Sequence, residues 1–186
     1  MSLVVNLFGS PSSGKSTLAA GSFYELKLAG YNAELITEYA KEKVWTEDVF
    51  TLSNQAYVTI KQYYMQDRPH GKVDCIVTDS PILLGAFYQR KGCTKSFVPY
   101  ILELFNSYKN LNIMLIMGEK QKETFSKSGR IHTLEESLEK EKEIQSFLED
   151  HEIGYRKVAV NGRDTLGIIK DIIVSQLPKP KNPTFE

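Results

Sequence analysis

The stretch from Gly9 to Thr17 constrains the fold of this chain more than any other part of the sequence. It reads Gly-Ser-Pro-Ser-Ser-Gly-Lys-Ser-Thr and fits the pattern G-x-x-x-x-G-K-[ST]. The apolar run Leu3–Phe8 before it predicts a buried strand, and from Lys15 onward apolar residues recur at helical spacing. A strand, a glycine-containing loop and a helix in this order predict a phosphate-binding loop.

The residue types of this loop suit a nucleoside triphosphate. Gly9 and Gly14 allow a tight turn that aims backbone N–H groups into one concavity, and the following helix adds the positive end of its dipole. Lys15 can reach the β- and γ-phosphates, and the Ser16 hydroxyl is placed to bind Mg²⁺. The alternative, a glycine-rich turn that binds nothing, is disfavoured by the flanking strand and helix. We expect ATP to contact Gly9, Ser10, Pro11, Ser12, Ser13, Gly14, Lys15, Ser16 and Thr17.

The size and charge of the chain narrow the classes of function. Its 186 residues suffice for one α/β domain with a core, but not for two. Lys plus Arg and Asp plus Glu number 23 each, so no overall charge draws the chain to nucleic acid or membrane, although a local basic patch is compatible with this balance. No apolar run reaches the length of a membrane span, and the first leads directly into the loop, so we expect no signal peptide and no membrane partner. Cys75 and Cys93 lack C-x-x-C spacing, which favours a reducing, cytoplasmic setting.

The remainder of the chain alternates between strand and helix patterns. Strands are predicted at residues 3–8, 33–36, 73–78, 112–117 and 155–160, with helical patterns between them. Thr133 with Glu136 forms a capping box at the start of one of these helices. Five strands alternating with helices predict an α/β fold with a parallel sheet in three layers.

The helix predicted at residues 54–67 carries several aromatic residues. Tyr57, Ile60 and Tyr64 recur at helical spacing, and we expect most of this stripe to lie in the core. The pattern leaves open whether other residues of this helix face a substrate pocket, namely Gln55, Gln62 and Tyr63.

Two carboxylates close predicted strands on the sheet edge that holds the phosphate loop. Glu38 follows the strand at 33–36 and is a candidate for accepting the proton of an acceptor hydroxyl, or for orienting that group. Alternatively, it only favours the positive end of the next helix. Asp79 closes an apolar strand as a Walker B aspartate does and is a candidate for holding Mg²⁺, directly or through water. Asp79 could at the same time be a helix N-cap before Pro81.

A cationic segment follows the fourth predicted strand. It contains Lys120, Lys122, Lys127 and Arg130, with Ser128-Gly129 as a flexible point. Such a segment can close over a triphosphate and offset the charge of the transferred phosphoryl group. We interpret the lysines as a solvated face, whereas the rigid fork of Arg130 suits phosphate oxygens.

Several of these segments together resemble one protein family. They are the phosphate loop, Thr37-Glu38-Tyr39-Ala40-Lys41-Glu42, Thr78-Asp79-Ser80-Pro81-Ile82-Leu83-Leu84-Gly85, and Gly129-Arg130 with the Thr-Leu-Glu-Glu that follows. The sequence resembles the small P-loop kinases related to the ribosylnicotinamide kinase domain, many of them stand-alone proteins of bacteriophages. The resemblance covers nearly the whole chain to about Leu177.

The resemblance implies a strand order of 2-3-1-4-5 and a mobile lid around Arg130. It also implies an adenine-contacting loop at Asn161-Gly162-Arg163 and an acceptor site bounded by Glu38 and Asp79. We therefore expect a kinase domain over residues 1–177 that uses ATP and Mg²⁺. Residues 178–186 have too little apolar surface to fold and are predicted to be a disordered tail.

The resemblance implies a nucleoside-type acceptor without fixing which one. Related phage kinases include those that phosphorylate 5-hydroxymethyluracil in DNA, a step in thymidine hypermodification, and such a protein would act in the host cytoplasm. Ribosylnicotinamide enzymes are often fused to an adenylyltransferase domain that is absent here, which favours the DNA base; the neutral composition favours a free nucleoside. A non-kinase P-loop ATPase usually has a glutamate beside the Walker B aspartate, where this chain has Ser80.

Overall fold

The strands form a single parallel sheet with the order β2-β3-β1-β4-β5. The computed structural model describes residues 1–89, 93–119, 122, 133–162 and 164–180. Its strands are β1 (Leu3–Phe8), β2 (Ala33–Ile36), β3 (Cys75–Thr78), β4 (Lys109–Met117) and β5 (Arg156–Val160). The predicted parallel α/β sheet and the strand order that the resemblance implied are confirmed.

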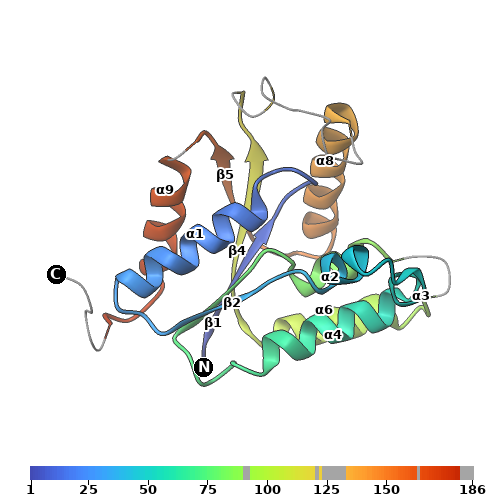
Figure 1. Ribbon diagram of the computed structural model, residues 1–186, viewed down its shortest axis with the longest axis horizontal. Coiled ribbons are helices and arrows are strands. Elements are labelled where there is room, and N and C mark those ends of the chain that lie inside the picture. The colour runs from blue at the N-terminus through green and yellow to red at the C-terminus, as the bar shows by residue number, and fades with distance from the viewer. Residues whose placement is uncertain (90–92, 120–121, 123–132, 163, 181–186) are drawn as a thin grey trace.

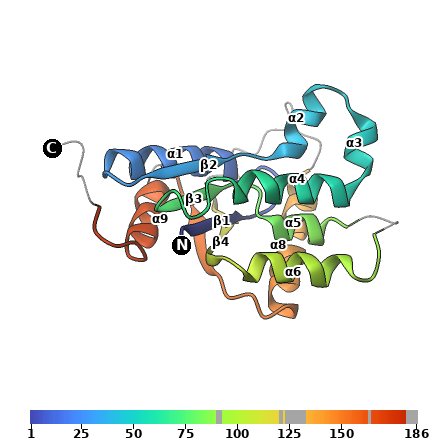
Figure 2. The same ribbon diagram turned by 90° about the horizontal axis from the view of Figure 1, so that it is seen from below.

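Helices cover both faces of this sheet (Figure 1). One face carries α1 (Lys15–Leu28) and α9 (Asp164–Val174), which pack against each other. The other face carries α4 (Gln55–Asp67), α5 (Ile82–Phe87), α6 (Phe97–Asn106) and α8 (Leu134–Asp150). The short helices α2 (Tyr39–Trp45) and α3 (Val49–Ser53) lie beside α4 at one end of the molecule (Figure 2). The predicted three layers are therefore present.

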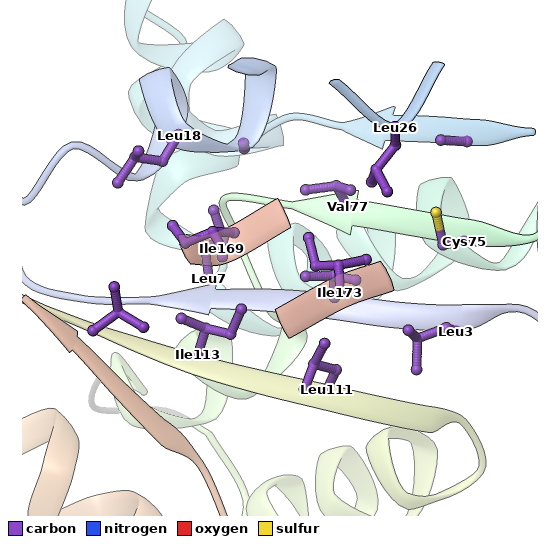
Figure 3. Close-up of a cluster of buried hydrophobic side chains, with 14 of the residues drawn as sticks. Leu3, Leu7, Leu18, Leu26, Cys75, Val77, Leu111, Ile113, Ile169 and Ile173 are labelled. Carbon is purple, nitrogen blue, oxygen red and sulfur yellow. The ribbon is translucent and has the colours of Figure 1, made fainter. Parts of the chain in front are cut away.

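The period-two alternation of β1 divides the core between the two faces of the sheet. Leu3, Val5 and Leu7 pack toward α1 and α9, where they meet Leu26 and Ile173 (Figure 3). Phe8 packs on the opposite side, among side chains of α5, α6 and α8. A strand that is buried on both faces reads as a continuous apolar run, which is how this segment appears in the sequence.

Side-chain caps define the starts of three helices. Thr133 and Glu136 form the predicted capping box at α8. Asp48 Oδ1 accepts a hydrogen bond from the backbone N–H of Thr51 at 3.0 Å, and Asn54 Oδ1 accepts one from that of Tyr57 at 3.0 Å. These caps start α3 and α4, and α3 was not expected from the sequence.

The expectation that the aromatic stripe of α4 lies in the core is wrong. Tyr57, Ile60 and Tyr64 are 50%, 38% and 55% exposed. The buried side of this helix carries instead Val58, Thr59, Gln62 and Gln66. The polar side chains are inside because two of them meet specific neighbours there, as described below. No helix in the described part of the chain is long and apolar enough to cross a membrane.

Candidate active site

The phosphate loop follows β1 and is held by its own backbone and by Lys15. Ser12 and Gly14 have positive φ angles of 68° and 89°, which turn consecutive peptide groups toward one side. The N–H groups at the start of α1 have no acceptors within the helix and face this loop. Lys15 Nζ donates to the carbonyl oxygens of Gly9 and Ser10, each at 2.9 Å. The loop therefore has the shape and the donors of an anion-binding concavity.

Three neighbouring strands deliver the predicted site residues to one edge of the sheet. The loop follows β1, Glu38 follows β2 and Asp79 follows β3, and these strands are adjacent in the order β2-β3-β1. Ile36 and Asn6 both pair with Thr78, so the three strands end at nearly the same level. This convergence is expected for the carboxyl edge of a parallel sheet.

A cavity of about 380 Å³ opens between these residues and the helices α4 and α5. Phosphate-loop, carboxylate, amide and apolar side chains all contribute to its wall. The lining residues are Pro11, Lys15, Glu38, Ala40, Leu52, Gln55, Val58, Thr59, Gln62, Asp79, Ser80, Pro81, Ile82, Leu84, Gly85 and Tyr88. The cavity thus joins the predicted phosphate-binding residues to a chamber large enough for a second molecule.

The charged groups of the cavity perturb one another. Burial lowers the pKa of Lys15, while the carboxylates of Glu38 and Asp79 oppose this shift. The pKa of Glu38 is raised, first by the loss of hydration within the cavity walls and second by repulsion from Asp79; Lys15 and Lys41 act in the opposite direction. Part of the Glu38 side chain is nevertheless exposed to solvent. Its carboxylate is therefore more basic than that of an ordinary surface glutamate.

Gln62 fixes the backbone on both sides of Glu38. Its Oε1 accepts a hydrogen bond from the backbone N–H of Tyr39 at 2.9 Å, and its Nε2 donates to the carbonyl oxygen of Thr37 at 3.2 Å. Gln62 is only 4% exposed, and Glu38 itself forms no side-chain cap on α2. The sequence left open whether Gln62 faces a pocket; it lines the cavity and also holds the segment that carries Glu38.

Asp79 is buried without a hydrogen-bond partner for Oδ1 among the described residues. It is 4% exposed, and it does not cap α5, whose N-cap is Pro81 without a side-chain cap bond. A buried carboxylate oxygen without a donor is costly unless a cation or water meets it. The donor set of one carboxylate near a phosphate loop fits Mg²⁺, which keeps several waters and binds substrate phosphates. Ser16, the second residue of α1, is the predicted second ligand.

Among the described residues, one aromatic side chain lines the cavity. Tyr88 stands at the end of α5, and burial together with the charges of Glu38 and Glu143 raises its pKa to about 12. Its hydroxyl is therefore protonated at neutral pH. Tyr63, which the sequence offered as an alternative, lies instead between two core clusters with its ring 6.1 Å from that of Tyr108.

Thr59 and Gly85 bring α4 and α5 into close contact behind the cavity. A Cβ atom on Gly85 would lie 2.1 Å from Thr59 Oγ1 and 2.8 Å from Thr59 Cβ, so only glycine fits there. Sequence reasoning missed Thr59, because the local pattern of α4 does not show which residue of another helix it contacts. Leu52 and Val58 were missed for the same reason.

The remaining predicted residues lie apart from this cavity or outside the described residues. Asn161 and Gly162 follow β5 on the same edge of the sheet, and the Asn161 backbone N–H donates to Thr165 Oγ1 at 2.9 Å. Gly162 has a φ of 79°. Arg163, Arg130 and most of the predicted lid fall outside the described residues.

Comparisons with known proteins identify the fold. No family model matches the sequence, and no curated protein matches it. The structure of deoxyadenosine kinase from M. mycoides with products dCMP and a flexible dCDP bound superposes with a TM-score of 0.54 and 17% identity, over 92% of this chain and 99% of that chain. The same enzyme with bound dATP gives 0.53 and 16%, over 92% and 98%. Shikimate kinase from Bacteroides thetaiotaomicron gives 0.50 and 13%, over 92% and 98%. The chain therefore has the fold of P-loop kinases.

Proposed function

We propose that this chain is an ATP-dependent kinase that transfers the γ-phosphate to a hydroxyl of a nucleoside-type acceptor. The observation that carries the proposal is the convergence of Lys15, Glu38 and Asp79 around one cavity that continues from the phosphate loop. A P-loop fold alone is compatible with simple ATP hydrolysis. A chamber beside the loop, with a carboxylate of raised pKa in its wall, favours transfer to an acceptor instead.

In this mechanism the loop binds the triphosphate and Lys15 moves from the Gly9 and Ser10 carbonyls to the β- and γ-phosphates. The acceptor oxygen forms a bond to the γ-phosphorus as the bond to the β,γ-bridging oxygen breaks, which releases ADP. Glu38 takes the proton of the acceptor hydroxyl, and its raised pKa makes it a stronger base than an ordinary glutamate. Lys15 offsets the charge that develops on the transferred oxygens.

Asp79 and Ser16 are the residues that would hold Mg²⁺. When bound, the ion neutralises charge on the phosphates. The buried Asp79 Oδ1 supports this assignment. We assign Asn161 and Gly162 to adenine binding and Arg130 to covering the phosphates, because the resemblance to ribosylnicotinamide-type kinases implies these roles.

We further infer that the acceptor is 5-hydroxymethyluracil in phage DNA, so that the reaction takes place in the host cytoplasm. The combination of Tyr88 with the amides of Gln55 and Gln62 suits a planar base that carries a primary hydroxyl. Among structures of similar fold, a deoxyadenosine kinase with dCMP and dCDP bound supports an acceptor of nucleoside type. The resemblance includes phage kinases that act on this base, which supports the DNA base as the acceptor.

Transfer of label from γ-labelled ATP tests the proposal. We expect label on DNA that contains 5-hydroxymethyluracil, and none on matched thymine DNA. Label on free ribosylnicotinamide alone would assign the acceptor to the free nucleoside, and label released only as inorganic phosphate would contradict kinase activity. Lys15→Ala should lose at least ~10²-fold in turnover, because it removes the loop cation that stabilises transferred charge.

A further inference from the structure

Helix α4 presents its aromatic side to solvent and its polar side to the core. Tyr57, Ile60 and Tyr64 are exposed, whereas Thr59, Gln62 and Gln66 are buried. This is the reverse of an ordinary surface helix, whose apolar stripe faces the core. Exposed apolar side chains gathered on one face mark surfaces that bind a partner.

The exposed side of α4 forms a groove with α2. The groove has a volume of about 400 Å³. Tyrosines and cations make up most of its wall, together with one carboxylate and one methionine. We name it the tyrosine groove and define it by Tyr39, Glu42, Lys43, Tyr57, Lys61, Tyr64, Met65 and Arg68.

The cations of the tyrosine groove lie over aromatic rings. Lys61 Nζ is 5.2 Å from the centre of the Tyr64 ring and the Arg68 guanidinium is 5.8 Å from it. Lys43 Nζ lies 5.2 Å from the Tyr39 ring and forms an ion pair with Glu42 at 3.0 Å. Glu42 is thus neutralised by Lys43, which leaves Lys61 and Arg68 as positive charge beside two half-exposed rings.

Helix α4 lines both the tyrosine groove and the catalytic cavity. Residues on different sides of α4 line the two hollows. Thr59 and Gln62 face the cavity, whereas Tyr57 and Lys61 face the groove. On the other wall, Glu38 faces the cavity and Tyr39, the next residue, faces the groove. An α-helix with its side chains is about 10–12 Å across, and α4 contributes to the wall of each hollow.

We propose that the tyrosine groove binds the single-stranded nucleic acid segment that flanks the acceptor base. This inference rests on the proposed function, because it explains how a base within a polymer is presented to the neighbouring cavity. Tyr57 and Tyr64 supply faces on which bases stack, and Lys61 and Arg68 supply cations for the phosphates. A base extruded from the bound strand reaches the catalytic cavity around the edge of α2 and α4.

The charge of the groove favours a polynucleotide over a protein partner. An apolar protein surface seated there would remove Lys61 and Arg68 from water without providing anions. A strand of nucleic acid brings one phosphate per nucleotide and releases counterions when these cations bind it. The balanced total charge of the chain does not oppose such local binding, because exposed charges are screened within about 10 Å.

Fluorescence anisotropy with a labelled (dT)₁₂ oligonucleotide tests the groove without the reaction. We expect binding that weakens as salt rises, because phosphate contacts release counterions. Tyr57→Ala/Tyr64→Ala and Lys61→Gln/Arg68→Gln should each weaken the oligonucleotide Kd at least ~10-fold, and the second pair should also reduce the salt slope. One matched control is Tyr100→Ala, at a half-exposed tyrosine on α6. The other is Lys157→Gln, at an exposed lysine of β5 that lies over the Tyr155 ring. Both should bind as the parent chain does.

Phosphoryl transfer then separates this inference from the proposed function. The groove variants should keep the parent rate on a free nucleoside acceptor and lose at least ~10-fold in kcat/KM on the same base within an oligonucleotide. Absence of oligonucleotide binding at low salt, or binding that the groove variants leave unchanged, would overturn the inference. So would concentration-dependent self-association that Tyr57→Ala/Tyr64→Ala abolishes, because it would assign this face to a second copy. Oligonucleotide binding through the groove without any phosphoryl transfer would instead refute the kinase proposal and leave the groove standing.

Discussion

Folding stability and the proposed chemistry make opposite demands on Glu38. Its pKa is raised in the folded chain, so the folded state holds the proton more tightly than the unfolded state does. Stability contributed by the protonated form is present at low pH and is lost as pH rises through the unfolded pKa toward the folded one. At neutral pH the carboxylate therefore costs stability, while under the proposed function it supplies the general base.

Replacing Glu38 by Gln should separate these two effects. We expect turnover to fall by ~10²-fold or more, the usual scale for a lost general base, while ATP binding persists. The Tm at neutral pH should rise slightly, because a neutral amide avoids the repulsion from Asp79, and the rise should shrink as pH falls toward the carboxyl pKa. The control is Glu34→Gln on the exposed side of β2, which should change neither quantity. Loss of nucleotide binding by Glu38→Gln would contradict its role toward the acceptor.

Gln62 should act on the reaction through the position of Glu38. Gln62→Met keeps the size of the side chain and removes both hydrogen bonds to the segment Thr37–Tyr39. We expect kcat to fall about tenfold, because a small displacement of a catalytic group is costly, with an unchanged Kd for ATP. Gln66→Met is the matched control on the same helix, since the Gln66 amide is buried without a partner among the described residues. Equal effects of the two substitutions would show that Gln62 only fills space.

At the scale of the elements, the contact between α4 and α5 sets the width of the cavity. Both helices line it, and they touch where Gly85 meets Thr59. Gly85→Ala must push the helices apart, so we expect a loss of about 1–3 kcal/mol in the free energy of unfolding and a raised KM for the acceptor. Thr59→Ala removes the nearest of the clashing atoms, Oγ1 and Cγ2. The double variant Gly85→Ala/Thr59→Ala should therefore recover part of the free energy of unfolding and part of the acceptor KM.

Gly167 provides the control for the substitutions at Gly85 and Thr59. It lies within α9, and a Cβ atom there would meet nothing within 4 Å. Gly167→Ala should therefore stabilise the chain by up to about 1 kcal/mol through helix propensity. Chemical denaturation of the four variants measures these differences. Additive effects of Gly85→Ala and Thr59→Ala would contradict a direct contact.

The elements differ in how far the sequence predicts them. The phosphate loop, β1 and the capping box of α8 follow from local patterns, because their residue types serve the backbone immediately around them. The burial of α4 was predicted the wrong way round, since apolar periodicity identifies a face but not whether that face meets the sheet or a partner. Glu38 and Asp79 could be placed on one edge by strand topology, whereas the contacts of Gln62 and Thr59 depend on neighbours more than 20 residues away.

At the scale of the whole molecule, triphosphate binding should stabilise the entire fold. The loop joins β1 to α1, and both lie in the central core, so a ligand held there binds only the folded chain. ATP with Mg²⁺ at about 100 times Kd should add ~2.7 kcal/mol, which corresponds to roughly 5–11 °C in Tm. Differential scanning fluorimetry measures this shift. AMP, which lacks the β- and γ-phosphates, should shift Tm far less, and equal shifts with both would place the ligand elsewhere.

The strand order also determines when the sheet can form during synthesis. β1 is made before the other four strands, but its neighbours in the sheet are β3 and β4. Its pairing on both sides is therefore complete only when Met117 has emerged. At ~5–20 residues per second, roughly 4–14 s pass between the synthesis of Phe8 and that of Thr78, and this largely apolar segment has no strand partner for that time. Nascent-chain binders that shield hydrophobic stretches therefore have a target in β1 until β3 has been made. An interruption before β4 yields a fragment in which β1 has β3 on one side and no strand on the other, so the strand that carries the phosphate loop lies at an open sheet edge.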